Sequence, residues 1–366
     1  MHGQANREQL LQIAQSGVLA PSADNRHVFQ IELADAAIGL WPTREFRTCS
    51  DLLRRVLGLV SLGAVAENMQ LRARELGFEA NRQWTLGAAD GPLLQLTLHP
   101  SDAPADPLAQ AIPARHTNRR MYHGPALGTA EKDLLTSATS AAQGIRVEWL
   151  EGKARRRALH LIWLAESERF RRRHLHQDLY ASIRFDLGWN ESAEVSIPPG
   201  ALEVEPPMRP AFKAFRHWSL MRPLALLGLH RVLGLRAGLL PCWQAPALGV
   251  LTTELPLEEG AIAVGAAFER LWLRATLMGL ALQPMAASAV MGYQSPGVVD
   301  GASTQLRSRL TEGWRSILPA TAPLMIFRLG RAQPPSIVSH RPPLETFITT
   351  AQRLDGQRTE VNNCAR

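Results

Sequence analysis

Two short polar stretches carry the side chains best suited to bind a ligand. Residues 22–27 read SADNRH, within LAPSADNRHVFQ at 19–30, and supply a hydroxyl, an amide and an imidazole. The arginine run RHTNRR at 115–120 supplies guanidinium forks beside a hydroxyl, which is the donor set that a phosphate dianion prefers. Each stretch also has a simpler interpretation. The first could be an Asx-type turn that caps the next element, and the second a solvated charged turn.

Other familiar site chemistries are missing from the sequence. It has no Gly-x-Ser-x-Gly elbow, His-Glu-x-x-His helix, Walker A loop or Gly-x-Gly-x-x-Gly after a strand. His174 and His176 are two residues apart, which suits a metal pair on a strand, but they fall in a predicted helix. The basic clusters at 155–157 and 171–173 lack interleaved aromatic residues that stack on bases. We therefore predict neither a metal site nor nucleic-acid binding.

The composition predicts a globular protein with a basic surface. Hydrophobic residues make up 46% of the 366 residues and charged residues 20%, so a large buried core is feasible. The formal net charge of +7 comes mostly from arginine and permits a nucleic acid, a membrane surface or a phosphorylated cofactor as partner. Three isolated cysteines and a start, MHGQANREQL, without the apolar core of a signal peptide indicate a cytoplasmic location. No uncharged apolar run reaches the roughly 18 residues of a spanning helix.

The elements around the polar stretches follow from apolar periodicity. In the first part we predict helices at 6–18 and 52–77 and strands at 28–33 and 93–98, followed by a connector at 99–107. In the second part we predict helices at 107–113, 129–142, 153–180 and 260–281, strands at 145–150, 247–252 and 323–329, and a tail from Pro334 that wraps over the surface.

One region lies outside this alternation of helices and strands. Residues 185–218 are irregular and rich in proline, which predicts a loop or lid. Residues 219–240 are apolar with interspersed basic residues, among them Arg222 and Arg231. Such a segment is either a helix on a membrane surface or a helical cap over a pocket. We favour the cap, as expected inside a soluble enzyme.

A repeat joins the two parts of the chain. Residues 63–78, GAVAENMQLRARELGF, and 265–280, GAAFERLWLRATLMGL, align without gaps and share seven of sixteen positions. Both helices are rich in Ala, Leu and Arg, so shared composition is the alternative explanation. The small residues at both starts, Gly63 and Gly265 among them, permit close backbone approach. The repeat predicts two copies of one unit, an isologous dimer joined into a single chain.

These stretches resemble the motifs of the nitroreductase family of FMN-dependent oxidoreductases. APSADNRHVF at 20–29 is similar to the family's Ala-Pro-Ser-x-x-Asn motif, and GAVAENMQLRARELG at 63–77 to its central helix. RHTNRRM at 115–121 is similar to its opening Arg-Arg-Ser-x-Arg run, and SHRPPLETFI at 339–348 to its closing segment. The single-chain arrangement of two copies looks most like the Acg branch of that superfamily, in which a lid covers the flavin site.

The resemblance implies an α+β, nitroreductase-like fold. Two tandem copies of an α/β unit would form an intramolecular pseudo-dimer around antiparallel-rich mixed sheets and long central helices. The first copy would span 1–106. The second would span 107–366, with a lid-like insertion at about 185–246 and a wrapping C-terminal tail.

The resemblance also implies one FMN, bound between the two copies. The residues that would hold its phosphate are Arg115, His116, Thr117, Arg119 and Arg341. The residues that would face its ring and ribityl chain are Ser22, Asn25, His27, Pro284 and Met285. The first copy has no arginine run of its own, so a second FMN is not expected. Three departures from the family motifs change the contacts: Thr117 replaces Ser, Met121 replaces Phe, and His27-Val28-Phe29 replaces Gln-Pro-Trp.

The implied activity is reduction of a nitroaromatic, quinone or similar electron-poor small molecule by NAD(P)H through flavin hydride transfer. No side chain is named as acid or base. The expected contacts of the lid are Trp189, Phe212, Phe215 and Trp218. One alternative is a lidded flavin-binding or flavin-sequestering protein without turnover, and another is a scaffold that binds no flavin. We expect a monomer, with further self-association left open, and no membrane contact.

Overall fold

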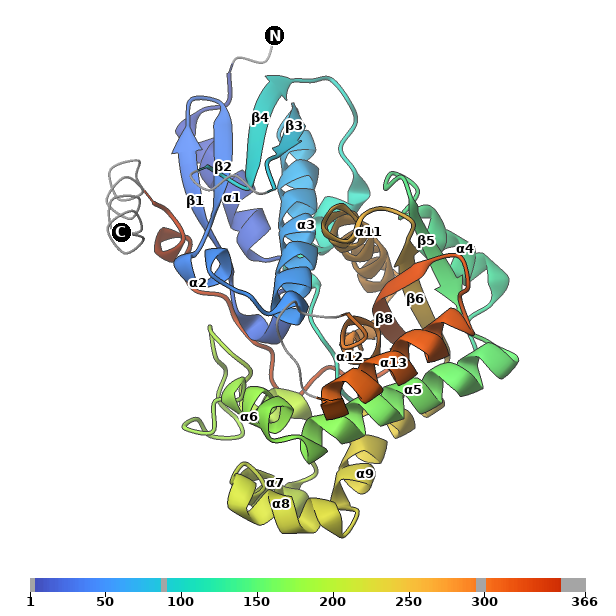
Figure 1. Ribbon diagram of the computed structural model, residues 1–366. Helices are drawn as coiled ribbons and strands as arrows, with labels where there is room; N and C mark the ends of the chain where they lie inside the picture. The colour runs from blue at the N-terminus through green and yellow to red at the C-terminus, as the bar shows by residue number, and fades with distance from the viewer. Residues whose placement is uncertain (1–3, 87–90, 294–300, 350–366) are drawn as a thin grey trace.

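Two antiparallel sheets flank a pair of crossed central helices (Figure 1). The structure is a computed structural model that describes residues 4–86, 91–293 and 301–349. The elements of the first unit are α1 (Arg7–Val18), β1 (Phe29–Ala34), β2 (Ala37–Pro42), α2 (Arg44–Arg47), α3 (Leu52–Glu75), β3 (Phe78–Trp84) and β4 (Leu94–Pro100), with a 3₁₀ turn at Ala23–Asn25. Its sheet has the order β1-β2-β4-β3, and every neighbouring pair is antiparallel.

The second unit repeats this order. Its core elements are β5 (Ile145–Trp149), β6 (Ala247–Thr253), α11 (Leu257–Leu277), β7 (Ala281–Pro284) and β8 (Ala322–Gly330), preceded by a 3₁₀ helix (Pro107–Ala114) and α4 (Thr129–Ser137). The sheet order is β5-β6-β8-β7, so α11 joins the two strands that correspond to those joined by α3. The predicted α+β fold with two copies of one unit is confirmed. Both sheets are antiparallel rather than mixed, and parallel pairing in the described residues occurs at isolated bridges.

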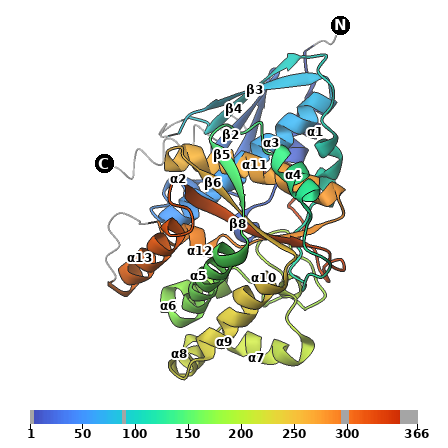
Figure 2. The same ribbon diagram turned by 90° about the vertical axis from the view of Figure 1, so that its right-hand side faces the viewer.

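A long helical segment separates β5 from β6, where the first unit has a tight turn at Asp35 and Ala36. It contains α5 (Gly152–Arg171), α6 (Arg173–Ala181), α7 (Arg209–Ala214), α8 (Trp218–Leu226), α9 (Leu229–Gly234), a π-helical turn (Leu235–Leu239) and α10 (Leu240–Gln244). These helices form the lower layer in Figures 1 and 2. No single helix of the described chain has the length and apolar composition needed to cross a membrane. The pair Trp218–Leu226 and Leu229–Gln244, bent by 97°, meets that requirement when taken together.

Sequence periodicity misses β2 and β3 for opposite reasons. Every residue of β2 is buried, so apolar and polar residues do not alternate along it. β3 is an edge strand whose outer half, at residues 81–83, is polar and exposed. The helices α12 (Ala287–Val290) and α13 (Gly301–Arg315), the strand β7 and the short helices between 199 and 214 are also not predicted, whereas the helical character predicted for 219–240 is confirmed by α8, α9 and α10.

Three predicted helices have different limits in the structure. The helix predicted at 153–180 is broken at Arg172, whose backbone is extended (φ −97°, ψ 129°) while its guanidinium binds the Glu168 carboxylate at 2.7 Å. The helix predicted at 129–142 ends at Ser137, and a series of turns follows. The helix predicted at 260–281 ends at Leu277, because the chain must turn into β7.

The central helices α3 and α11 cross at two glycines. A Cβ atom on Gly63 would lie 2.0 Å from the carbonyl oxygen of Ile262, and one on Gly265 would lie 2.0 Å from that of Val60. The two contacts are equivalent, because Val60 and Gly63 align with Ile262 and Gly265 in the repeat. Reciprocal contacts of this kind define an isologous, two-fold interface. The sequence repeat is therefore a repeat of structure.

The C-terminal tail returns to the first unit. The Ile31 N–H donates to the Phe347 carbonyl at 2.7 Å, and the Thr349 N–H donates to the Ile31 carbonyl at 2.8 Å. The Phe347 ring stacks on Phe29, with 5.4 Å between the ring centroids. The tail thus extends the first sheet beyond β1 and carries Arg341 between the two units.

The glycine crossing gives a direct test of the shared core. We expect Gly63→Ala and Gly265→Ala each to lower the free energy of unfolding by roughly 1–3 kcal/mol, because the added methyl group meets a backbone carbonyl that cannot rotate away. Urea unfolding followed by circular dichroism measures the change. Gly128→Ala is the control, because its Cβ would meet no atom closer than 3.9 Å. Equal stabilities for all three variants would contradict the close approach.

Candidate functional site

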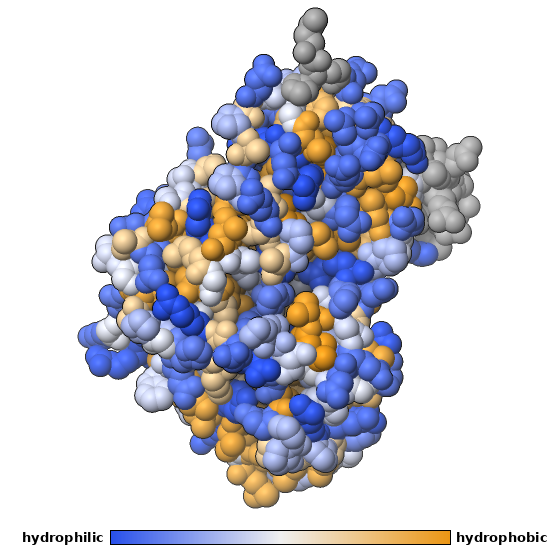
Figure 3. Space-filling view, turned by 180° about the vertical axis from the view of Figure 1, so that it is seen from behind, coloured by the Kyte–Doolittle hydropathy of each residue, from blue (hydrophilic) through white to orange (hydrophobic). Residues whose placement is uncertain are grey.

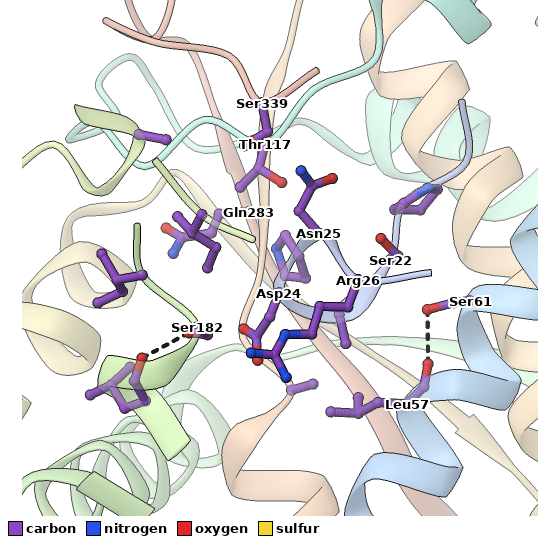
Figure 4. A pocket seen from close by; sticks show the side chains of 18 of the residues that line it. Ser22, Asp24, Asn25, Arg26, Leu57, Ser61, Thr117, Ser182, Gln283 and Ser339 are labelled. Carbon is purple, nitrogen blue, oxygen red and sulfur yellow. Dashed lines mark hydrogen bonds between the residues drawn. The ribbon is translucent and has the colours of Figure 1, made fainter. Parts of the chain in front are cut away.

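A cavity of about 1220 Å³ lies where the two units, the helical segment and the tail meet. Its walls come from α3, the turn at 22–27, the arginine run, the end of β7 and the tail. In Figure 4, Ser22, Asn25, Thr117 and Ser339 surround this space. All ten residues predicted to bind the cofactor line the cavity: Ser22, Asn25, His27, Arg115, His116, Thr117, Arg119, Pro284, Met285 and Arg341.

The arginine run is held inside the protein. Arg115 and Asn118 are only 7% and 3% exposed. The Asn118 N–H donates to the Leu282 carbonyl at 3.1 Å, and its side-chain amide donates to the Gln333 carbonyl at 2.8 Å. The run is therefore fixed between β7 and the start of the tail. The alternative of a solvated charged turn is wrong.

Arg115 already has an anionic partner. Its Nε lies 3.1 Å from the Glu269 carboxylate on α11, its Nη2 donates to the Leu19 carbonyl at 2.8 Å, and its guanidinium lies over the Trp272 ring. Burial raises the pKa of Glu269 to about 7, even though the positive charge of Arg115 acts in the opposite direction. Burial likewise lowers the pKa of Arg115. Glu269 was not predicted as a site residue, because nothing in the sequence marks it apart from the repeat.

Arg119 and Arg341 have partners without charge. Arg119 donates to the Ala201 carbonyl at 3.2 Å. Arg341 donates through Nη1 to the Asn25 side-chain oxygen at 2.5 Å and through Nη2 to the Ala20 carbonyl at 3.0 Å. The Nε of Arg341 is buried and has no hydrogen-bond acceptor. Neither arginine forms an ion pair with a carboxylate of the described residues.

The two arginines therefore lack an ion-pair partner among the described residues, although Glu269 attracts Arg341 from beyond contact distance. Burial and the neighbouring Arg115 lower the pKa of Arg341 to about 9, and burial lowers the pKa of Arg119. Asp24 lines the same cavity and attracts Arg119, but the two side chains are not in ion-pair contact. A partly desolvated cation without an ion-pair partner is costly, so an anion in the cavity would stabilise both groups.

Asn25 binds backbone groups instead of facing open space. Its backbone is left-handed (φ 55°), a conformation that Asn tolerates better than most residues. Its side-chain nitrogen lies 3.0 Å from the Glu194 carbonyl, 3.2 Å from that of Ser196 and 3.3 Å from that of His340. Its oxygen accepts from Arg341. The amide thus fastens both the helical segment and the tail to the first unit, a role that the sequence does not predict.

Ser22 and His27 present free polar atoms. The Ser22 hydroxyl and the His27 Nε2 are buried and have no hydrogen-bond partner in the protein. Burial, together with the nearby charge of Arg341, lowers the pKa of His27 to about 3, so its imidazole is neutral. Its ring packs edge-on against Phe347 at 4.9 Å. With the Arg341 Nε, three unsatisfied polar atoms line one cavity, which is the expected arrangement for a polar ligand.

The remaining predicted residues are less open to a ligand. The His116 Nδ1 lies 2.8 Å from the Ala114 carbonyl, and burial lowers the pKa of His116. Pro284 has no backbone N–H, and the Met285 N–H donates to the Ile326 carbonyl at 2.7 Å. Neither residue therefore has a free backbone N–H to donate to a ligand. Both still contribute to the wall.

Two of the four aromatic contacts predicted for the lid line the cavity. Phe212 and Phe215 do so, whereas Trp189 and Trp218 do not. Trp189 packs beneath the guanidinium of Arg209, 4.8 Å from the ring centroid. Trp218 packs against a histidine of α6, with 5.2 Å between the centroids. Both tryptophans stabilise the helical segment itself.

The two histidines of α6 do not form a metal site. His176 is buried, and its Nε2 lies 2.8 Å from the Phe215 carbonyl, while His174 is exposed. In the part of the chain that the structure describes, no group of three or more potential metal ligands is close enough to hold an ion.

Several lining residues were not predicted. The Ser61 hydroxyl on α3 bonds its own helix at Leu57, 2.9 Å away. Gln283 accepts from buried Arg328 at 2.7 Å, which fixes its amide at the cavity wall. Glu166 and Arg169 on α5 form an ion pair of 3.0 Å on the opposite wall. These residues lie on helix and strand faces whose orientation depends on the tertiary structure.

Comparisons with known proteins give one curated relative and several solved structures. No protein-family model matches the chain. It is 24% identical over 357 residues to the uncharacterized protein MT1398 of Mycobacterium tuberculosis, covering 90% of this chain and 46% of that protein. The chain therefore spans about half the length of the curated relative it matches.

Several of the similar solved structures are of proteins whose names include FMN. One is the FMN-dependent nitroreductase NfnB from Mycobacterium smegmatis in complex with NADPH (17% identity, TM-score 0.38, 67% of this chain and 99% of that one). Another is a nitroreductase with bound FMN from Bacteroides fragilis (12% identity, TM-score 0.37, 68% of this chain and 100% of that one). A third is the NADPH:FMN oxidoreductase from Vibrio harveyi complexed with NAD+ (11% identity, TM-score 0.36, 70% of this chain and 86% of that one).

The depressed pKa of His27 predicts a pH-dependent stability. Between its usual pKa of 6.5 and its folded value of about 3, the unfolded chain binds more protons than the folded one. Stability should therefore fall as the pH falls through this window, by up to about 1.4 kcal/mol per pH unit from this residue. Urea unfolding between about pH 7 and pH 5 should show a shallower slope for His27→Gln than for the wild type. Parallel slopes would contradict the buried, neutral imidazole.

The contacts of Asn25 predict a local effect. Asn25→Gly keeps the left-handed backbone but removes the amide, so residues 193–197 and 338–342 should lose protection from hydrogen exchange while the central helices keep theirs. Mass spectrometry of deuterium uptake measures this. Ser22→Ala, in the same turn, is the control and should leave both segments protected, because the Ser22 hydroxyl has no protein partner. Unchanged uptake in Asn25→Gly would show that other contacts hold these segments.

Proposed function

We propose that this chain is an FMN-dependent oxidoreductase of the nitroreductase type that uses NAD(P)H to reduce a nitroaromatic, quinone or similar electron-poor small molecule. The observation that carries the proposal is the pair of half-buried arginines, Arg119 and Arg341, which form no ion pair with a described carboxylate and lie beside the unsatisfied Ser22 hydroxyl and His27 Nε2. All four face a cavity large enough for a cofactor and a substrate. The motif resemblance of the same residues supports FMN as the ligand.

The phosphate end of the ligand would lie at the arginines. Arg119 and Arg341 would supply the charge-assisted donors, with Thr117 and His116 beside them. Arg115 would add little net charge to the phosphate site, because the Glu269 carboxylate already balances its charge. It would act mainly by holding its place in the cavity wall. Arg115 and Arg341 are anchored to the neighbouring carbonyls of Leu19 and Ala20, where helix α1 has ended. These anchors keep both guanidinium groups in place before the ligand binds.

The ring end would lie against the first unit and the central helices. The neutral His27 and Ser22 would hydrogen-bond polar ring atoms, and Val60 and Ala64 of α3 supply an apolar wall. A bound flavin accepts and donates hydride at its ring, and that chemistry belongs to the cofactor. The chain would bind it, orient it and exclude water. No side chain is needed as acid or base.

The bounds of the two copies, the lid and the branch of the superfamily are proposed from the same resemblance to nitroreductases. We propose that the two copies span 1–106 and 107–366, that 185–246 acts as a lid, and that the chain belongs to the Acg branch. Phe212 and Phe215 from this segment line the cavity, which supports the lid. They would contact the electron acceptor.

A second function, flavin binding without turnover, is favoured by one observation. Asn25 ties residues 193–196 and the tail to the first unit through hydrogen bonds to three carbonyls at 3.0–3.3 Å. A lid fastened in this way would retain a flavin and exclude the second substrate. Anaerobic addition of NADPH to the flavin-loaded protein separates the two functions. Loss of the flavin's visible absorption supports the enzyme, and an unchanged spectrum supports sequestration.

Flavin binding itself can be tested through the phosphate. We expect Arg119→Ala to weaken FMN binding by roughly ten- to a hundredfold, the usual effect of losing a hydrogen bond to a charged group, and to leave riboflavin binding unchanged. Quenching of flavin fluorescence measures both affinities. Arg120→Ala is the control, because Arg120 lies in the same run but binds the Ser336 hydroxyl outside the cavity. Equal losses for FMN and riboflavin would contradict a phosphate at Arg119.

A further inference from the structure

The helical segment between β5 and β6 has an unusual charge pattern. From Pro206 to Thr253 the sequence contains no Asp or Glu. The cations within this stretch are Arg209, Lys213, Arg216, Arg222, Arg231 and Arg236. Such a region repels other cations and attracts an anionic surface.

A protruding apolar corner lies in the middle of this stretch. Leu226 and Leu227, where α8 ends, are each 84% exposed. Gly228 follows with φ +95°, and a Cβ atom there would meet nothing within 4 Å. The helices on either side of this corner are bent by 97°. We call Leu226, Leu227 and Gly228 the α8–α9 corner.

Exposed apolar side chains continue on both sides of the corner. They are Leu220 (41%), Val232 (59%), Leu235 (41%) and Trp243 (64%). In Figure 3 hydrophobic residues gather at the lower end of the molecule, where Figure 1 places α8 and α9. The inner faces of these helices are already packed, since Met221, Ala225 and Gly234 are buried. The outer apolar surface therefore has no role in this core.

Arginines accompany the exposed leucines. Arg222 precedes Leu226 by four residues, and Arg231 precedes Leu235 by four, so each arginine shares a helix face with a leucine. Both arginines are exposed, and neither forms an ion pair with a described carboxylate. An arginine can keep its charged head at a polar boundary while its stem lies along apolar surface.

We propose that the α8–α9 corner docks on the surface of an anionic lipid bilayer. Leu226 and Leu227 enter the boundary between headgroups and acyl chains, and Arg222 and Arg231 bind lipid phosphates. A bilayer suits a convex corner that pairs leucines with unpaired arginines, because one surface supplies both apolar depth and negative charge. This docking is independent of the flavin and differs from our expectation of no membrane contact.

The docked face also borders the cavity. Val232 is 59% exposed and lines the cavity together with Leu233, Arg236 and Ala237. The outer face of this segment would meet the bilayer while its inner face forms a cavity wall. The two interpretations of residues 219–240, cap and membrane-surface helix, are therefore compatible.

Vesicle flotation with the full chain tests the docking. The protein should float with vesicles of phosphatidylglycerol and phosphatidylcholine in equal parts and remain unbound with phosphatidylcholine alone. Leu226→Glu should lower the partition coefficient about tenfold or more, since a leucine would no longer be buried. Arg222→Gln and Arg231→Gln should each lower it about fivefold. Leu134→Glu is the matched control, because Leu134 is 52% exposed on α4, away from the corner, and should bind as the wild type does.

Three results would overturn the proposal. The first is no flotation of the wild type with the anionic vesicles. The second is equal binding by Leu226→Glu and Leu134→Glu, with circular dichroism showing both folded. The third is a dimer in light scattering that Leu226→Glu converts to a monomer, because the corner would then join two copies of the chain. Arg222→Gln keeps the test valid if Leu226→Glu fails to fold.

Discussion

The close approach of α3 and α11 is the constraint on which the rest of the structure depends. At Gly63 and Gly265 the helices meet backbone to backbone, with no room for a side chain. One continuous hydrophobic core therefore includes residues of both units. Val60 and Ala64 of α3 flank this contact and line the cavity, as do Phe268 and Trp272 of α11. The distance between opposite cavity walls is consequently set by two residues that have no side chain.

The two units keep one geometry but use it differently. Glu67 and Glu269 hold the same position in the repeat. Glu67 binds Arg270 at 2.8 Å and Arg82 at 3.1 Å, an ionic contact that joins the units away from the cavity. Glu269 instead pairs with Arg115 beside the cavity. The same carboxylate therefore joins the two units in one case and positions an arginine of the cavity wall in the other.

The sequence predicted which residues come together at one cavity better than it predicted the contacts that each of them makes. Every predicted cofactor residue lines one cavity, because the motifs that carry the family resemblance are contiguous stretches whose meeting depends only on the fold. The roles of single groups depend on neighbours that are distant in sequence. The Asn25 side-chain nitrogen donates to backbone carbonyls at four distant positions, and the Met285 N–H donates to a carbonyl of β8. Neither hydrogen bond can be predicted from the residues that neighbour Asn25 or Met285 in the sequence. The same holds for β2, whose complete burial removes the alternation that would mark a strand.

The path of the tail has a consequence for how the protein is made. Arg341 meets Asn25 although the two are 316 positions apart in the chain, and Ile348 adds to the edge of the first sheet. Domains usually fold in order as they leave the ribosome. Here Arg341 and Ile348, which complete the cavity wall and the outer edge of the first unit, are synthesised more than 300 residues after Asn25 and Ile31. Contacts between residues so far apart in sequence slow folding. The nascent first unit must therefore remain soluble while the edge strand β1 has no partner on its outer side. A cut between the two units would separate the first unit from the tail residues that contact it.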